Sequence, residues 1–307
     1  MLTIGSRGSQ LALWQARWIE GRLEAFGERA RIEIIKTTGD KITDVPLAKV
    51  GTKGLFTKEI EEALLDRRID VAVHSLKDLP TEMPEGLVIA AVPERQDPCD
   101  ALVGRKLADL PPGAKVGTSS LRRVAQIRAL RPDIVIESVR GNVDTRLRKL
   151  DEGMYDAIVL AAAGLKRLGW ESRIAEILPP EVMCPAVGQG ALAVETRGDG
   201  GTGQQVCARL NHETTRIAVA AERALLGALG GGCQVPIGAY ATCEGETLRL
   251  LGLVASPDGE TVIRRQTVGT RSDAECLGRE LGRELLAAGG SQILEAVYGF
   301  SLRDLKK

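Results

Sequence analysis

Residues 2–9 read LTIGSRGS, residues 10–26 read QLALWQARWIEGRLEAF, and residues 31–37 read RIEIIKT. Residues 2–5 and residues 31–37 are rich in apolar and β-branched residues, which predicts strands. The middle run carries an apolar stripe at helical spacing, made of Leu11, Leu13, Trp14, Ile19 and Leu23. A strand, a helix and a second strand in this order predict a βαβ unit and a mainly parallel sheet.

The same alternation continues along the chain. We expect a helix at 57–66 and strands at 69–75 and 88–92. After the prolines of 93–98 the pattern restarts, with strands expected at 101–103, 115–117, 134–138 and 157–161 and helices at 121–130, 144–152 and near 163–168. These repeated units predict a second α/β domain, which the prolines of 179–185 end.

The last third of the chain has a different pattern of predicted helices and strands. A strand expected at 191–195 can return to the first domain, which would make the chain cross twice between the two, and the glycines of 198–203 predict a flexible loop. Later elements are a helix at 216–229, strands at 239–243, 248–255 and 260–269, and a closing helix at 274–288. We therefore expect three domains: residues 1–92 with 191–208, residues 96–186, and an α+β domain with an antiparallel sheet at residues 211–307.

Composition excludes several classes of protein. The 41 basic and 41 acidic residues cancel, which argues against bulk binding to nucleic acid or to membranes. No apolar run approaches the ~18 residues of a membrane span, and the N-terminus lacks a signal-peptide pattern, so we expect a cytoplasmic protein. The six cysteines form no C-x-x-C pair and there are two histidines, so we expect neither a zinc site nor a disulfide framework. Five of the cysteines are interpreted as reduced packing residues.

Polar clusters follow the expected strands at equivalent positions. They lie at 5–9, 49–54, 74–78, 117–123 and 138–142, with Arg146 and Arg148 in the next helix. Each cluster alone is also compatible with a helix cap or a solvated helix face. Ligands of open α/β sheets bind at the carboxyl ends of strands, where helix N-termini and arginines suit anions. The chain lacks the phosphate-binding motif G-x-x-x-x-G-K-[ST], so the clusters predict a polycarboxylate rather than a nucleotide.

Two residues point to chemistry. Asp78 is acidic among basic residues and follows Lys77, so its carboxylate can stabilise a developing cation or accept an N–H bond. Cys233 follows three glycines in residues 229–238, LGGGCQVPIG, where its thiol can act as a nucleophile or an attachment point. The alternatives are an ordinary aspartate at a strand end and a small apolar residue in a tight turn.

These segments together resemble the porphobilinogen deaminase family, also called hydroxymethylbilane synthases, over essentially the whole chain. The matching segments are 6–13 (SRGSQLAL), 49–56 (KVGTKGLF), 74–78 (HSLKD), 117–123 (GTSSLRR), 140–142 (RGN), 185–190 (PAVGQG) and 231–236 (GGCQVP). One departure is Gly230, where many members have a larger or acidic residue.

The resemblance implies a fold, a cofactor and a reaction. It implies two α/β domains like the halves of a type II periplasmic binding protein, plus the smaller α+β domain at the C-terminus. It also implies a dipyrromethane cofactor joined to Cys233 by a thioether. The implied transferase condenses four porphobilinogen molecules head-to-tail with loss of ammonia and then hydrolyses off hydroxymethylbilane, on the way to haem and other tetrapyrroles.

The resemblance also implies roles for individual residues, with Asp78 as the catalytic carboxylate. The implied cofactor-binding residues are Cys233, Lys77, Asp78, Ser75, Thr118, Ser119, Ser120, Arg122, Arg123, Arg140, Gly141, Arg146 and Gln189. The implied substrate-binding residues are Arg7, Ser9, Lys53, Phe56, Arg140, Arg146, Arg167 and Gln189. No metal is implied, porphobilinogen is the expected partner, and we expect a monomer that binds neither nucleic acid nor membranes.

Two alternatives compete with this interpretation. The first is an anion-binding module without catalysis, since the two-domain binding fold also serves transport and sensing. Such a module has no need for Asp78 among arginines or for a glycine-flanked thiol at Cys233. The second is a degenerate homologue that keeps only the fold, although all the motif residues named above are present.

Overall fold

The computed structural model describes residues 1–41, 55–231 and 235–299. The chain forms two compact units. One consists of Met1–Gln96 and Gly190–Arg216, and the other of Asp97–Gln189 and Ile217–Lys307. Neither unit is continuous in sequence, because the chain leaves the first unit after Gln96 and returns to it at Gly190.

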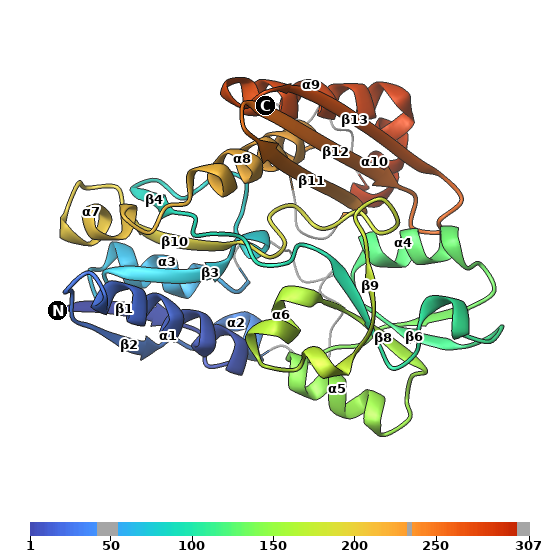
Figure 1. The fold of residues 1–307 in the computed structure, drawn as a ribbon, viewed down its shortest axis with the longest axis horizontal. Coiled ribbons are helices and arrows are strands. Elements are labelled where there is room, and N and C mark those ends of the chain that lie inside the picture. Colours follow the sequence, from blue (N-terminus) through green and yellow to red (C-terminus); the bar gives the residue numbers. More distant parts are fainter. Residues whose placement is uncertain (42–54, 232–234, 300–307) are drawn as a thin grey trace. The chain divides into compact units, whose positions relative to one another are not determined.

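The first unit is built on a five-stranded sheet with the order β2-β1-β3-β10-β4 (Figure 1). The strands are β1 (Leu2–Ser6), β2 (Ala30–Ile34), β3 (Val71–Ser75), β4 (Leu87–Ala91) and β10 (Leu192–Arg197). β1 pairs in parallel with β2 and β3, whereas β10 runs antiparallel to β3 and β4. The expected return of the later strand to the first sheet is therefore confirmed.

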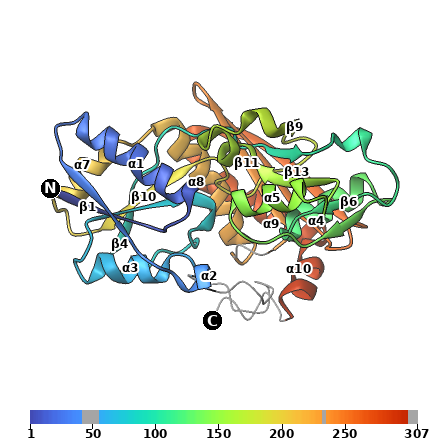
Figure 2. The same cartoon turned by 90° about the horizontal axis from the view of Figure 1, so that it is seen from below.

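Helices cover both faces of this sheet. The helical segments are α1 (Gln10–Glu24), α2 (Thr38–Lys41), α3 (Lys58–Leu65), α7 (Thr202–Ala208) and the 3-10 turn η2 (Leu76–Asp78). Ile19 of α1 packs in one core with Val73, while Ile60 of α3 packs in another with Ala72. Because successive residues of a strand face opposite ways, α1 and α3 lie on opposite faces (Figure 2).

The second unit contains a sheet of the same design, with the order β7-β6-β8-β5-β9. Its strands are β5 (Asp100–Val103), β6 (Lys115–Gly117), β7 (Val135–Glu137), β8 (Ala157–Ala161) and β9 (Ile174–Leu178). Its helical segments are η3 (Leu107–Asp109), α4 (Leu121–Leu130), α5 (Val143–Asp151), α6 (Ala162–Arg167) and η4 (Glu171–Arg173). β6 is parallel to β7 and β8, and β5 is antiparallel to β8 and β9.

Both sheets therefore share one arrangement, in which the fourth strand alone runs against its neighbours. In the first sheet this strand comes from later in the chain, and in the second it comes from earlier. An antiparallel strand brings its first residue to the edge where the parallel strands end. Asp100 of β5 lies opposite Ala161 at the end of β8, and Leu192 of β10 lies opposite Ser75 at the end of β3. The expected α/β class, with two such sheets and a smaller α+β part at the C-terminus, is confirmed.

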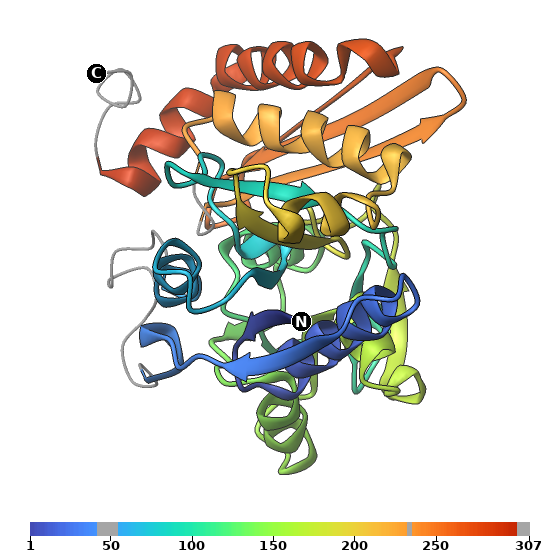
Figure 3. The same ribbon diagram turned by 90° about the vertical axis from the view of Figure 1, so that its left-hand side faces the viewer.

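The α+β part belongs to the second unit. The antiparallel strands β11 (Ile237–Glu244), β12 (Thr247–Ala255) and β13 (Val262–Thr270) are followed by η5 (Arg271–Asp273), α9 (Ala274–Leu285), η6 (Leu286–Gly290) and α10 (Ser291–Tyr298). Helix α8 (Glu213–Ala228) lies beside α9, and Leu225, Leu250 and Leu281 share their core (Figure 3). The turn after β12 packs on α4, where Arg128 Nη1 donates to the Pro257 carbonyl at 2.9 Å.

Several elements differ from those expected. β9, α2 and α10 were absent from the predicted elements, and α7 begins at Thr202, inside the predicted glycine loop. Cys184 and Cys207 are buried, which raises the pKa of each thiol to about 12. Cys276, however, is exposed, so its interpretation as a packing residue is wrong. It lies on the solvent side of α9, a helix whose apolar residues face the sheet. The boundaries of the three expected domains stay a prediction.

Candidate functional site

In the first unit, polar residues gather where β1 ends. Arg7 follows the strand, and its guanidinium carbon lies 4.2 Å from the centroid of the Phe56 ring. This cation–π contact joins two residues that were expected to bind substrate. Ser9 is the N-cap of α1, where its Oγ accepts from the Ala12 amide at 3.2 Å.

The end of β3 presents the residues on which catalysis was predicted to depend. Leu76 is buried and anchors the turn η2, so that Lys77 is half-buried and Asp78 is exposed. Gln15 of α1, which is itself buried, donates from Nε2 to Ser75 Oγ at 2.9 Å. The sequence analysis missed Gln15, because a lone glutamine in an amphipathic helix carries no signal of its own.

The residue before Ser75 belongs to a buried polar cluster. His74 Nε2 lies 2.9 Å from Glu195 Oε2, and both side chains are almost fully buried. Glu61 of α3 is also buried, and burial raises the pKa of its carboxyl, with the nearby charge of Glu195 adding to the effect. This histidine–carboxylate pair joins β3 to β10 at the residue that precedes Ser75.

In the second unit, the turn after β6 carries the small polar residues that were expected to bind the cofactor. Thr118 is buried, whereas Ser119 is exposed and its Oγ donates to the Val139 carbonyl at 2.7 Å. Ser119 Oγ also lies 2.8 Å from Ser138 Oγ, so the turns after β6 and β7 are joined. Ser120 holds the N-cap position of α4, but its side chain makes no capping bond.

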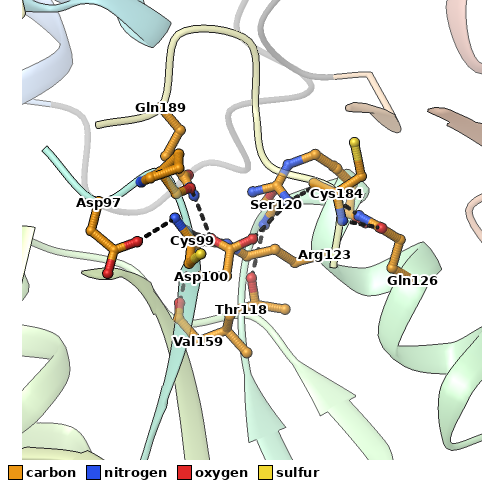
Figure 4. Close-up of polar contacts among 12 residues, drawn as sticks. Asp97, Cys99, Asp100, Thr118, Ser120, Arg123, Gln126, Val159, Cys184 and Gln189 are labelled. Carbon is orange, nitrogen blue, oxygen red and sulfur yellow. Dashed lines mark hydrogen bonds and ion pairs between the residues drawn. The ribbon is translucent and has the colours of Figure 1, made fainter. Parts of the chain in front are cut away.

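Arg122 and Arg123, at the start of α4, meet at the buried carboxylate of Asp100. Figure 4 shows Arg123 and Gln189 beside this carboxylate. Arg122 Nη1 donates to Asp100 Oδ2 at 2.7 Å, while Arg123 donates to Oδ1 from Nε at 3.0 Å and from Nη2 at 2.7 Å. Gln189 Nε2 donates to the same Oδ1 at 2.9 Å. Asp100 therefore joins three residues that were expected to bind cofactor or substrate.

The electrostatics of this cluster keep Asp100 ionised. Burial favours the neutral acid, but the charges of Arg122 and Arg123 outweigh it and hold the pKa of Asp100 far below its ordinary range. Burial lowers the pKa of Arg123, against the opposing effect of Asp100. One carboxylate faces two guanidinium groups, so the cluster of these three residues carries a net positive charge. Asp100 did not appear among the predicted site residues.

The remaining predicted residues of the second unit lie after β7 and at the end of α6. Gly141 has φ +108°, a conformation that favours glycine, and its carbonyl accepts from Arg146 Nε at 2.8 Å. The Arg140 carbonyl accepts from Lys149 Nζ at 3.3 Å. Arg167 is buried, and loss of solvation lowers the pKa of its guanidinium to about 10.

Two predicted residues, Lys53 and Cys233, lie outside the described residues. The chain just before Cys233 is described, and Gly230 and Gly231 both have positive φ values, +95° and +68°. The hydroxyl of Tyr298 on α10 donates to the Gly231 carbonyl at 2.5 Å, and burial raises the pKa of this tyrosine to about 12. The last described helix thus holds the backbone two residues before the cysteine.

Two general properties complete the description. Across residues 1–41, 55–231 and 235–299, helices that combine the length and the apolarity of a membrane span are absent. In the same parts of the chain, groups of three or more histidine, cysteine or carboxylate side chains suited to a metal ion are also absent.

Comparison with known protein families gives two matches that together span most of the chain. Residues 2–204 match the model described as "Porphobilinogen deaminase, dipyromethane cofactor binding domain". Residues 216–287 match "Porphobilinogen deaminase, C-terminal domain".

Solved structures resemble the chain only distantly. A periplasmic substrate-binding protein of an ABC transporter from Coxiella burnetii aligns over 73% of this chain and 97% of its own, with 15% identity and a TM-score of 0.43. A nutrient-binding protein from Burkholderia cenocepacia, bound to methionine, aligns over 67% and 90% of the two chains, with 11% identity and a TM-score of 0.41.

Curated relatives are much more similar. Porphobilinogen deaminase of Syntrophobacter fumaroxidans is 54% identical over 303 residues, covering 97% of this chain and 98% of its own. Porphobilinogen deaminase of Geotalea daltonii is 54% identical over 301 residues, covering 97% and 95% of the two chains. On the identity and coverage of these relatives and on both family matches, the chain belongs to the porphobilinogen deaminase family.

Proposed function

We propose that this chain is a hydroxymethylbilane synthase, which condenses four porphobilinogen molecules head-to-tail, releases ammonia and hydrolyses off hydroxymethylbilane for tetrapyrrole biosynthesis. The observation that carries the proposal is that residues 2–204 and residues 216–287 both match models of this family. Cys233 lies inside the residues that match the C-terminal domain. The carboxylates of porphobilinogen also suit the arginine-rich strand ends described above.

The side chains present fit a dipyrromethane cofactor, whose acetate and propionate groups need cationic and N–H donors. Among the described residues, Arg122 uses only Nη1 in hydrogen bonds to the protein, so Nε and Nη2 can bind a carboxylate. Cys233 would hold the cofactor through its sulfur. The residues that would assist are Lys77, Ser75, Thr118, Ser119, Ser120, Arg122, Arg123, Arg140, Gly141, Arg146 and Gln189.

The cofactor, when bound, supplies the pyrrole ring to which the first substrate is added. Asp78 accepts N–H hydrogen bonds from the reacting pyrroles and stabilises positive charge there as the amine leaves. Its exposed position on the short turn η2, beside Lys77, supports this role. The buried Leu76 keeps the turn fixed while Asp78 stays accessible.

The arginines that were expected to bind substrate would pair with its carboxylates. Arg7, Arg140, Arg146 and Arg167 would pair with acetate and propionate groups, with help from Ser9, Lys53 and Gln189. Phe56 supports Arg7 through the face of its ring and so limits the orientations of the guanidinium. Ser9 also caps α1, so its hydroxyl would have to serve both the helix and the substrate.

The same proposal includes the setting in which the enzyme works. We expect a cytoplasmic monomer of three domains (1–92 with 191–208, 96–186 and 211–307) that binds neither nucleic acid nor membranes. The equal numbers of acidic and basic residues support this expectation, because net positive charge is what draws proteins to such polyanions.

Intact-mass measurement of the denatured protein tests the function. The wild type should exceed its polypeptide mass by two condensed porphobilinogen units, and Cys233→Ser should lack this excess while remaining folded. Cys276→Ser, which changes an exposed thiol on α9, is the matched control and should keep it. A bare polypeptide that stays bare and consumes no substrate after incubation with porphobilinogen would favour the binding-module alternative.

A further inference from the structure

A single carboxylate organises one side of the proposed site. Asp100 is fully buried and accepts hydrogen bonds from Arg122, Arg123 and Gln189, at 2.7 to 3.0 Å. We propose that Asp100 is the positioning residue of this anion site: it fixes the guanidinium of Arg122 in the orientation that receives a carboxylate. This inference rests on the proposed function, because the carboxylate is taken to be that of the cofactor or substrate.

The topology explains why an acidic side chain reaches this place. β5 runs antiparallel to β8, so its first residue, Asp100, lies opposite Ala161 at the carboxyl end of β8. The N-terminus of α4 lies at the same edge, because the helix follows directly on β6. The reversed strand thus brings an acidic residue to the place where Arg122 and Arg123 begin α4.

The hydrogen bonds give the two arginines different tasks. Arg123 uses all three nitrogens within the protein, with Nε and Nη2 on Asp100 and Nη1 on the Val159 carbonyl at 2.9 Å. Arg122 uses Nη1 for both Asp100 and the Cys184 carbonyl, at 2.7 and 2.6 Å. Within the described part of the chain its Nε and Nη2 have no hydrogen-bond partner. Arg123 anchors the carboxylate, and the carboxylate holds Arg122.

This arrangement lowers the cost of binding an anion. A long side chain normally loses rotamer freedom when it grips a ligand, but Arg122 has lost that freedom before the ligand arrives. The residual positive charge of the cluster attracts a carboxylate, and the guanidinium fork then receives it in a fixed plane. Without Asp100, two neighbouring buried guanidinium groups would repel each other and Arg122 would lose its orientation.

Gln189 extends the same network to the segment that leads back to the first unit. Its Nε2 donates to Asp100 and to the Pro98 carbonyl at 2.7 Å. The preceding Gly188 amide donates to Glu222 Oε2 at 2.7 Å, and Cys184 exchanges hydrogen bonds with Gln126. Displacing Asp100 would therefore also loosen Gln189, a second residue proposed to contact ligand.

Two substitutions separate charge from position. Asp100→Asn keeps the shape and removes the charge, whereas Asp100→Glu keeps the charge and moves it by one methylene. Asp97→Asn is the matched control, because Asp97 also pairs with a cation, which is Lys166 at 2.8 Å. Each purified full-length protein is measured for cofactor occupancy by intact mass, for thermal midpoint, and for KM and kcat of the loaded fraction.

We expect cofactor occupancy to fall at least threefold in both Asp100 variants. KM for porphobilinogen should rise at least fivefold in their loaded fraction, with kcat within twofold of the wild type. Asp97→Asn should keep wild-type occupancy and KM. If Asp100→Asn fails to fold, Asp100→Glu still tests the inference, because it preserves the buried charge and its occupancy and KM can be measured.

The opposite result has two forms. Wild-type occupancy and KM in Asp100→Glu, beside an active wild type, would overturn this inference alone, even if the thermal midpoint fell. A wild type with neither a mass excess nor turnover would overturn the proposed function and this inference with it.

Discussion

At the scale of single residues, Asp78 and Asp100 show how burial and neighbouring charges determine what an aspartate can do. Asp78 is exposed on a short turn, where it can meet a ligand, whereas Asp100 is fully buried between two guanidinium groups. A buried carboxylate with such partners is already saturated with hydrogen bonds, so it acts on its neighbours rather than on a ligand. On our proposals, the same residue type serves catalysis at one position and alignment at the other.

Replacement of Asp78 should separate activity from stability. Asp78→Ala is expected to lower kcat by at least ~100-fold, because stabilisation of the developing positive charge is lost. The free energy of unfolding should change by less than ~0.5 kcal/mol, since the side chain is exposed. Porphobilinogen consumption and urea unfolding measure the two effects. Glu82→Gln, at another exposed acid nearby, is the control, and near-normal turnover by Asp78→Ala would refute the catalytic role.

The contrast also shows which site residues a sequence can reveal. Asp78 could be singled out as a candidate because it follows a strand and stands next to Lys77 in a polar motif. Asp100 opens the apolar strand 100–103, and Gln15 lies in an amphipathic helix, so neither belongs to a recognisable cluster. Their importance comes from residues far away in the chain, and only the pairing of β5 with β8 and the packing of α1 bring those residues close.

At the scale of helices and strands, glycines set the distance between α8 and α9. A Cβ added at Gly278 of α9 would lie 2.2 Å from the Ala221 carbonyl oxygen of α8. A Cβ at Gly282 would lie 2.7 Å from the Ala228 side chain. These contacts are too close for any larger side chain, so the helices meet backbone to backbone along this line.

The spacing of these helices gives a paired prediction. Gly278→Ala should lower the free energy of unfolding by ~1–3 kcal/mol, because the backbone of α8 cannot move away without opening the core. Gly227→Ala, on α8, meets no atom within 4 Å and should stabilise the protein by up to ~1 kcal/mol through helix propensity. Denaturant unfolding of both variants measures the difference, and equal effects would contradict the close packing.

Helices and strands whose own residues carry a clear apolar period were predicted better than those that form because of contacts with distant residues. Helix α4 has the predicted bounds, 121–130, because its apolar period and its flanking residues agree. β9 is a five-residue run next to prolines. Within the described sheets it pairs only with β5, and the topology of the sheet rather than the sequence of β9 selects this partner. The glycines of 198–203 favour a loop, yet α7 begins among them at Thr202, because Val206 and Cys207 of this helix enter the first core.

At the scale of the whole molecule, two buried carboxylates with pKa values shifted in opposite directions make stability depend on pH. The pKa of Asp100 is lowered in the folded state by its two arginines, so the folded protein binds fewer protons there than the unfolded chain. Its stabilisation is present above the unfolded pKa of ~4 and is lost as the pH falls below it. The pKa of Glu61 is raised by burial, so its contribution has the opposite sign and is lost as the pH rises.

Thermal unfolding between pH 3 and pH 8 checks these signs. The wild-type Tm should fall steeply below about pH 4, and Asp100→Asn should show a flatter acid limb from a lower plateau. Glu61→Gln should raise the Tm at pH 8 and leave it unchanged at pH 3, because a protonated glutamate and a glutamine are similar when neutral. Parallel curves for wild type and Asp100→Asn would contradict the assigned pKa direction.

The position of β10 in the first sheet governs the order in which a newly made chain can fold on the ribosome. Among the described strands β4 pairs with β10 alone, and β10 is synthesised only after all five strands of the second sheet, which span residues 100–178. The sheet encoded second can therefore close first, while β3 and β4 wait as exposed strand edges. Such edges invite pairing with other chains, so the interval before Leu192 emerges is when the nascent protein most needs a chaperone.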